Sequence, residues 1–200
     1  MAKLLVKRLN FGPIVRSVAK SQAFKRAARR VAQEHFNKAK NNLVQLFDSH
    51  PVTREIEGGA EASNSSGTLG GYGNLYTFIG FYKQENPVED VRNAIKIYTT
   101  ISRGKFTANK NKAHADFTIK TPTIEELATI TPMPWEGGSW LRSIERGISG
   151  FGYYMYKRWE EGRSGLGVII DNKVRSGGYK PTKYYSSLVS MFRREITSKR

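Results

Sequence analysis

An apolar stripe with helical spacing runs through residues 21–47, and no other feature of the sequence constrains the fold as strongly. Its members recur three or four residues apart, as they do on one face of an α-helix. They are Phe24, Ala28, Val31, Ala32, Phe36, Ala39, Leu43, Leu46 and Phe47. We predict one long helix that ends at His50-Pro51, because the residue before a proline avoids the helical region.

The positive charge of the chain is concentrated at its two ends. The 200 residues contain 33 Lys or Arg and 17 Asp or Glu, which gives a formal charge of +16. Residues 1–40 carry +10, residues 173–200 carry +7, and the segment between them sums to −1. Basic ends favour a polyanionic partner such as DNA, RNA or an anionic lipid surface. The candidate electrostatic contacts are Lys25, Arg26, Arg29, Arg30, Arg193 and Arg194.

Composition and length are typical of a folded protein with one domain. A chain of 200 residues can bury a sizeable core without covalent staples. The absence of cysteine excludes disulfides and thiolate zinc sites, and no apolar run approaches the ~20 residues that cross a bilayer. We predict a basic arm at 1–20, a single α+β domain at 21–197 with an extended loop at 57–74, and a basic tail at 198–200.

The middle of the chain predicts short strands and one further helix. The aromatic run at 75–82 follows a glycine-rich segment and has the composition of a strand. Asn86-Pro87 predicts a helix start, since a capping residue precedes a proline at the first helical position. Further strands are expected near 97–102 and 117–120. A basic loop between them contains Lys105, Lys110 and Lys112.

The last third of the chain predicts two amphipathic helices around a strand at 166–171. Ser139 can cap the first of these helices. Its apolar face contains Trp140, Ile144, Ile148, Phe151, Met155 and Trp159. The second helix starts near Pro181, and its face contains Tyr184, Tyr185, Leu188, Val189, Phe192 and Ile196. The predicted class is therefore α+β, with a long basic N-terminal helix, a small mostly antiparallel sheet, packed helices and a long glycine-rich loop.

The glycine-rich loop lacks a phosphate-binding pattern. A nucleotide-binding loop of that kind places Lys-Ser or Lys-Thr after its last glycine, and residues 67–73 contain neither. These glycines also precede the predicted strand at 75–82, whereas a dinucleotide site places them after a strand. The glycines therefore predict an extended loop with a bend, which does not bind a phosphate.

No other pattern predicts catalysis or metal binding. His35, His50 and His114 lack the spacing of metal ligands, and the Gly-x-Ser-x-Gly elbow of many hydrolases is absent. We therefore expect a protein that is not an enzyme, with no catalytic, cofactor-binding or metal-binding residues and no cofactor.

Aromatic residues crowd the window 135–159. Trp140 and Trp159 lie on the predicted helical stripe and are expected in the core, whereas three neighbouring tyrosines cannot all face one core. Trp and Tyr are enriched at interface hot spots. The candidate assembly-interface residues are Trp135, Tyr153, Tyr154, Tyr156, Gly70, Gly71 and Tyr72.

The basic residues allow several interpretations. They can form an ordinary solvated face. They can also bind nucleic acid, since each neutralised phosphate adds a salt-sensitive term to the affinity, although no recognised nucleic-acid-binding motif is present. The acid-poor composition of residues 1–33 is also that of an organelle transit peptide.

Short motifs follow one another in a set order along the chain. The first half contains HPVT at 50–53, SGTL at 66–69, NLYTFIGF at 74–81 and NP at 86–87. The second half contains PWE at 134–136, SWL at 139–141, IERGI at 144–148, RSG at 163–165 and a helix with Phe192. Over residues 20–195 this order resembles the neck and tail-completion proteins of tailed bacteriophages, which join the DNA-filled head to the tail.

The resemblance implies a structural virion protein at the head–tail junction, synthesised in the host cytoplasm. Such proteins are small non-enzymatic α+β subunits that form a homo-oligomeric ring, here a hexamer or a dodecamer. Their neighbours are portal or adaptor proteins and tail-tube or terminator proteins, with DNA passing nearby and no membrane. On this interpretation the loop at 58–73 contacts neighbouring subunits or rings.

The charge departs from this resemblance, because a DNA channel often repels DNA so that it can slide. We therefore expect the basic ends to face acidic partners on an outer or inter-ring surface. The alternative is a basic nucleic-acid-binding protein without enzymatic activity.

Overall fold

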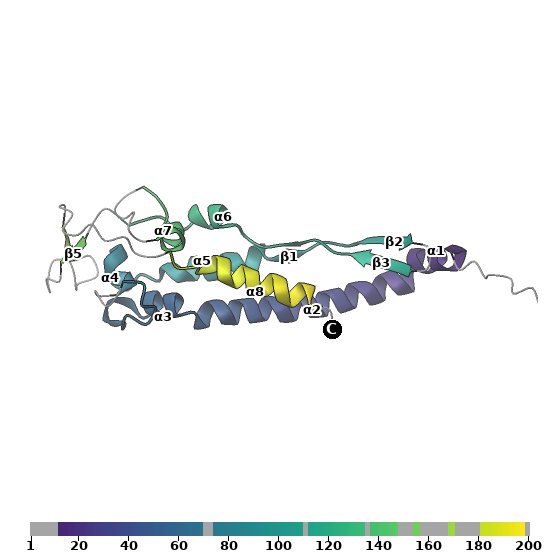
Figure 1. Ribbon diagram of the computed structural model, residues 1–200, viewed down its shortest axis with the longest axis horizontal. Coiled ribbons are helices and arrows are strands. Elements are labelled where there is room, and N and C mark those ends of the chain that lie inside the picture. Colours follow the sequence, from purple (N-terminus) through teal and green to yellow (C-terminus); the bar gives the residue numbers. More distant parts are fainter. Residues whose placement is uncertain are drawn as a thin grey trace, which may run out of the picture. The chain divides into compact units, whose positions relative to one another are not determined.

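The computed structural model describes residues 12–69, 74–109, 112–134, 137–147 and 181–198, and the backbone of residues 154–156 and 168–170. Within these described residues helices predominate (Figure 1), and the strands form three separate two-stranded antiparallel ladders. The predicted α+β class is therefore confirmed, as is the long N-terminal helix. The chain divides into two compact units, where the sequence predicts one domain. Unit 1 is Met1–Lys38 with Thr100–Lys120, and unit 2 is Ala39–Thr99 with Thr121–Arg200.

Unit 1 is built from helices and a β-hairpin. Its helices are α1 (Gly12–Lys20) and the first part of α2 (Gln22–Ser49). The hairpin pairs β2 (Lys105–Asn109) with β3 (Lys112–Asp116). At the end away from the hairpin loop, β1 (Thr100–Ile101) pairs with β4 (Ile119–Lys120). Helix α1 contacts both hairpin strands. Residues 12–20, which the sequence assigns to a basic arm, are thus part of a packed unit.

The hairpin folds as it does because its polar and apolar residues alternate. Every second residue of β2 and β3 is exposed, and the residues between them are half-buried. One face therefore turns to solvent and the other packs inward, as in a half-buried strand. Phe106 on the packed face meets Phe24 of α2 and Phe117 edge-on, with ring centroids 6.2 Å apart in both pairs.

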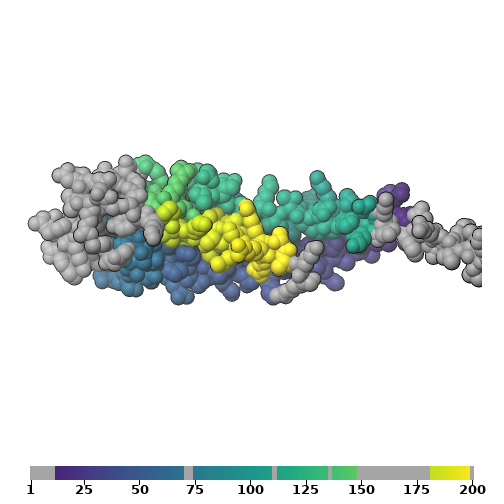
Figure 2. Space-filling view, viewed as in Figure 1, coloured from purple at the N-terminus to yellow at the C-terminus, as the bar shows by residue number. Residues whose placement is uncertain are grey.

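Unit 2 contains the larger core. Its helices include the second part of α2, α3 (Pro51–Glu57), the 3₁₀ turn η1 (Gly59–Glu61), α4 (Leu75–Ile79), α5 (Pro87–Tyr98), α6 (Ile124–Ala128), α7 (Trp140–Arg146) and α8 (Tyr185–Thr197). The short strands β5 (Tyr154–Tyr156) and β6 (Val168–Ile170) pair with each other. In the space-filling view, α8 lies across one face of the unit, beside the green segment that carries α6 and α7 (Figure 2).

The core of unit 2 is aromatic and aliphatic. Trp140, which the sequence places in the core, is fully buried and meets Phe81 edge-on, with ring centroids 5.9 Å apart. Tyr184 stacks on Phe47 at 5.9 Å and shares a hydrogen bond of 2.5 Å with Thr53. The α8 stripe is confirmed by the burial of Tyr184, Tyr185, Leu188 and Phe192.

The predicted strand at 75–82 is wrong, because residues 75–79 form helix α4. Asn74 caps this helix by accepting a hydrogen bond from the Thr77 backbone N–H at 2.9 Å. Gly80 ends it in the left-handed conformation, with φ of 83°, which glycine adopts without the steric cost of a side chain. The described part of the loop predicted at 57–74 contains the last residue of α3 and the 3₁₀ turn η1.

The predicted helix through Trp159 is also wrong in its length. Ser139 caps α7 as expected, accepting a hydrogen bond from the Arg142 backbone N–H, but the helix ends at Arg146. Gly147 follows with φ of 98°, which is incompatible with an α-helix. Residues 154–156, expected within the same helix, lie in strand β5.

Other expectations are confirmed or shifted. Helix α2 ends at Ser49, one residue before His50-Pro51, and Pro51 then opens α3. Helix α5 begins at Pro87 as predicted. The predicted strand at 97–102 is shorter, because α5 extends to Tyr98. The expected basic loop around Lys105 and Lys112 is instead the β2–β3 hairpin.

Candidate functional site

The positive charge gathers in unit 1 once the chain is folded. The residues of unit 1 include fifteen Lys or Arg and two acids, a formal charge of +13, whereas unit 2 carries +3. The first part of α2 and the segment 100–120 contribute to the same unit although they are far apart in sequence. The fold thereby turns two moderately basic stretches into one strongly basic body.

The basic candidates of α2 lie mostly in solvent. Arg26, Arg29 and Arg30 are exposed, and Lys25 is half-buried. Among the eleven Lys and Arg described in unit 1, only Arg30 has a carboxylate within ion-pair distance, Glu34 at 4.0 Å. Most of this charge is therefore not neutralised within the described part of the unit.

Sequence reasoning missed the basic residues that the hairpin segment adds. Exposed Arg103, Lys105, Lys112 and Lys120 belong to the same unit as the arginines of α2. The available signal was the run from 103 to 120, in which five Lys or Arg accompany the single acid Asp116. Arg193 and Arg194 are exposed on α8 and belong to unit 2.

Arg92 in unit 2 is a contrasting, structural arginine. Its guanidinium donates to Asp48 and Glu57 at 2.7 Å each and also pairs with Glu89. Its side chain is only 11% exposed. Burial acts to lower the pKa of Arg92, but the hydrogen bonds and charges of Asp48 and Glu57 outweigh it and raise the pKa. Arg92 thus ties α2, α3 and α5 together.

The loop before α4 is held by two buried polar side chains. The Asn74 amide nitrogen donates to the carbonyl oxygens of Gly59, Ala60 and Ala62, at 3.3, 2.8 and 2.8 Å. The carboxylate of buried Glu55 accepts from the backbone N–H groups of Ser66 and Leu75, at 2.8 and 2.7 Å. These hydrogen bonds engage the polar groups of Asn74 and Glu55 within the fold, so both side chains are structural.

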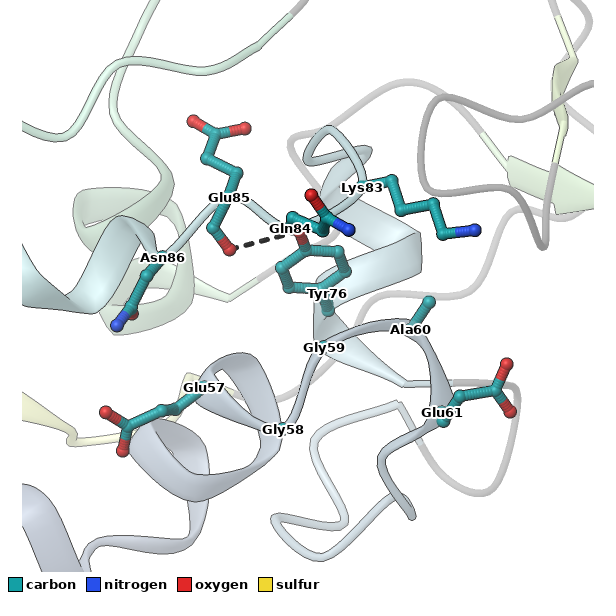
Figure 3. A pocket seen from close by; sticks show the side chains of 10 residues that line it. All are labelled: Glu57, Gly58, Gly59, Ala60, Glu61, Tyr76, Lys83, Gln84, Glu85 and Asn86. Atoms are coloured by element: carbon teal, nitrogen blue, oxygen red, sulfur yellow. Dashed lines mark hydrogen bonds between the residues drawn. The ribbon is translucent and has the colours of Figure 1, made fainter.

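A cavity of about 390 Å³ opens beside this loop (Figure 3). The Tyr76 ring lies between its walls, and the Tyr76 hydroxyl donates to the Glu85 carbonyl oxygen at 3.1 Å. The carboxylates of Glu57, Glu61 and Glu85 point in different directions. Diverging carboxylates cannot share one cation, so the cavity lacks the convergent ligands of a metal site.

The described residues contain no group of three or more His, Asp or Glu side chains that could hold a metal ion. The three histidines are dispersed: His35 is half-buried on α2, His50 precedes α3 and His114 is exposed on β3. Within the same described part of the chain, no helix is long and apolar enough to cross a membrane.

The candidate assembly residues fall largely outside the described residues. This applies to Trp135, Tyr153, Gly70, Gly71 and Tyr72. Tyr154 and Tyr156 lie in β5, of which only the backbone is described. Their part in assembly stays a prediction.

Comparison with known proteins gives no relative: the chain matches no family model, no curated protein and no solved structure.

Proposed function

We propose that this chain is a structural, non-enzymatic subunit of a tailed-phage virion, forming a homo-oligomeric ring at the head–tail junction. The observation that carries the proposal is the structural role of the motifs whose order resembles that of neck and tail-completion proteins. Every one of these motifs that falls in well-described residues of unit 2 serves capping, turning or packing.

The motif HPVT makes the corner between α2 and α3. The His50 side chain accepts from the Val52 backbone N–H, Val52 is fully buried, and Thr53 bonds Tyr184. The motif NLYTFIGF forms α4, whose residues are all buried. The side chains of these two motifs are largely buried or bonded within the fold, which supports a packing role for them.

The motif SWL performs the same kind of work. Ser139 caps α7, and Trp140 and Leu141 are buried beside it. Glu145 of the IERGI motif accepts from the backbone N–H and the hydroxyl of Ser186, both at 2.8 Å. It therefore stabilises the first turn of α8 in place of a side-chain cap on that helix.

Ring formation requires surfaces for neighbouring copies. Ile97 and Tyr98 at the end of α5 are 64% and 62% exposed. Exposed apolar side chains that adjoin one another are a feature of protein–protein contact sites. We propose that this pair lies in or near a contact between subunits, or between the ring and a portal, adaptor, tail-tube or terminator protein.

The test of the junction role is electron microscopy of particles that contain the chain, with an antibody marking it. We expect label at a single collar between head and tail, and averaging then gives the symmetry of the ring. Label that is absent from particles, or spread along nucleic acid, contradicts the proposal.

The surface pair provides a second, mutational test. The double change Ile97→Glu and Tyr98→Glu should reduce the assembled fraction of the purified protein in analytical ultracentrifugation without lowering its unfolding midpoint. The matched control is Lys96→Glu, which alters charge at the neighbouring exposed position. Equal assembly of all three proteins would exclude this surface.

A second candidate is a basic nucleic-acid-binding protein without enzymatic activity. It is favoured by the +13 charge of unit 1, of whose described Lys and Arg side chains only Arg30 has an ion-pair partner. Charge reversal of Arg26, Arg29 and Arg30 separates the two candidates. Loss of nucleic-acid affinity together with a smaller salt dependence favours the second candidate, and loss of assembly alone favours the first.

A further inference from the structure

Unit 1 contains a cleft of about 430 Å³ that is lined by basic, polar and apolar residues. Helix α2 supplies Arg29 and Gln33, and the segment between β1 and β4 supplies the opposite wall. The lining residues are Arg29, Gln33, Ile101, Ser102, Arg103 and Phe117. None of them is acidic, so the cleft presents hydrogen-bond donors and positive charge without a competing carboxylate.

The guanidinium of Arg29 is held in place at this cleft. Its Nε donates to the Arg103 carbonyl oxygen at 3.2 Å, and its Cζ lies 5.3 Å from the centroid of the Phe106 ring. These contacts use one N–H and one face of the group. The terminal nitrogens keep four N–H donors in a planar fork, which matches two oxygens of a phosphate.

The opposite wall includes the short connection between β1 and β2, residues 102–104, which brings further donors to the cleft. Ser102 Oγ accepts from the Thr118 backbone N–H at 2.8 Å, which leaves the hydroxyl proton free to donate. Gly104 has φ of +82°, and a Cβ there would lie 2.6 Å from the Phe117 ring. This connection therefore depends on glycine, and it carries exposed Arg103 next to Ser102.

We propose that this cleft is a phosphate-binding site, and that unit 1 uses it to grip the backbone of duplex DNA. Arg29 and Arg103 contact phosphate oxygens directly, and Ser102 donates a hydrogen bond. Arg26, Lys25, Lys105 and Lys112 supply the surrounding positive potential. The contacts are to the backbone, so binding is independent of base sequence.

The aromatic residues of unit 1 argue against a single-stranded ligand. Proteins that bind single strands stack bases on accessible aromatic rings. Phe24, Phe106 and Phe117 instead pack edge-on against one another and are half-buried. Of these three rings only Phe117 lines the cleft, so they do not form a row on which successive bases could stack.

The shape of the elements favours DNA over duplex RNA. The basic residues sit on a helix and on a two-stranded ribbon, and the wide major groove of B-form DNA admits both shapes. The major groove of A-form RNA is too narrow for side chains to enter. Duplex DNA is therefore the occupant that fits these elements best.

The experiment measures binding of the full-length recombinant chain to a fluorescent DNA duplex of random sequence by anisotropy, over a series of salt concentrations. The double variant Arg29→Gln and Arg103→Gln removes two phosphate contacts. We expect its affinity to fall at least about tenfold and the slope of log K against log salt to shrink by about 2. The matched control is Arg54→Gln on unit 2, which should bind like the wild type.

A conservative variant separates a loss of binding from a loss of folding. Arg29→Lys keeps the charge but loses the fork, so its salt slope should stay near that of the wild type while its affinity falls. Circular dichroism and unfolding midpoints confirm that each variant is folded. This inference rests on the second candidate function, nucleic-acid binding. The assay uses no virion, so its failure removes that candidate and leaves the microscopy test of the junction role unchanged.

Three outcomes overturn the inference. One is wild-type affinity for DNA that the double variant retains. Another is equal or tighter binding to single-stranded DNA or to duplex RNA of the same length. The third is no DNA binding at physiological salt together with binding to an acidic polypeptide such as polyglutamate, which would place the basic surface against an acidic protein.

Discussion

At the scale of single residues, unit 2 depends on a few polar side chains that each satisfy several partners. Arg92 meets three carboxylates, Asn74 meets three carbonyls and one N–H, and Glu55 meets two N–H groups. Buried polar groups are costly to leave unsatisfied, because each has given up its water. Substitutions at these positions should therefore lower the free energy of unfolding far more than the same substitutions at the surface.

Replacement of Arg92 by Met should destabilise the protein by about 1–3 kcal/mol, because three carboxylates then repel one another without a cation. The lower part of this range applies if solvent screens the carboxylates, which are 39–46% exposed. Urea unfolding measures the change. Arg30→Met, which breaks only the 4.0 Å surface pair with Glu34, should cost under about 0.5 kcal/mol. Equal costs at both sites would refute the central role of Arg92.

Asn74→Asp should separate the two tasks of this side chain. An aspartate still accepts from the Thr77 N–H and caps α4, but it cannot donate to the carbonyls of residues 59–62 and instead faces them with a negative charge. We expect a loss of about 1–3 kcal/mol in unfolding free energy. Asn86→Asp is the control, since Asn86 makes no side-chain capping bond, and should change stability by less than about 0.5 kcal/mol.

His50 should make the stability of unit 2 depend on pH. Burial lowers the pKa of His50 below its ordinary value of 6.5, and its Nδ1 accepts from the Val52 N–H at 3.2 Å. The unfolded chain therefore binds a proton more readily than the folded one. Stability is complete above about pH 6.5 and decreases as the pH falls below that value and through the lower folded-state pKa.

The measurement for His50 is the urea midpoint across this pH range. His50→Asn keeps a capping acceptor that does not titrate, so the variant should lose part of the dependence on pH. A wild type and a variant with identical pH profiles would show that His50 makes no contribution.

At the scale of elements, Gly104 in the connection between β1 and β2 decides how closely the chain approaches Phe117. Gly104→Ala should cost about 1–2 kcal/mol for the left-handed conformation, and an added loss from the clash with Phe117. Gly67→Ala is the matched control, because Gly67 has φ of +63° and nothing within 4 Å of the new Cβ. Thermal unfolding should therefore rank Gly104→Ala as the more damaging change. The opposite ranking would mean that Phe117 moves aside freely.

Elements with strong local signals could be predicted, and those without them could not. The periodic stripes of α2 and α8 and the Asn86-Pro87 start of α5 specify helices through neighbours in sequence. The alternation of residues 105–116 was also a usable signal for the hairpin, but the many lysines obscured it. The aromatic run at 75–79 is compatible with a strand or with a helix. The long-range hydrogen bonds at its start, such as that from the Leu75 N–H to Glu55, favour the helix.

At the scale of the whole molecule, the two units differ in the size of their cores. Among the described apolar residues, unit 1 buries only Ala19 and Phe36 fully, whereas unit 2 buries the aromatic cluster around Trp140 and Tyr184. Local stability follows buried apolar contact. Unit 1 should therefore open more easily than unit 2.

Hydrogen exchange checks this difference. The paired amides of β2 and β3 should exchange with lower protection than those of α5, in the free protein. Added duplex DNA should raise protection in β2, β3 and the first part of α2 if the proposed site is correct. Uniform protection across both units would contradict the difference in core size.

The sequence by itself determined the α+β class, the long helix α2, the helices that begin at caps and prolines, and the excess of positive charge. These features depend on residues close together in the chain. Only the tertiary structure decided that residues 75–79 are helical, that Arg92 joins three carboxylates, and that the basic residues of α2 and of 103–120 belong to one unit. Each of these depends on contacts between segments distant in sequence, whose buried hydrogen bonds and charges outweigh weak local preferences.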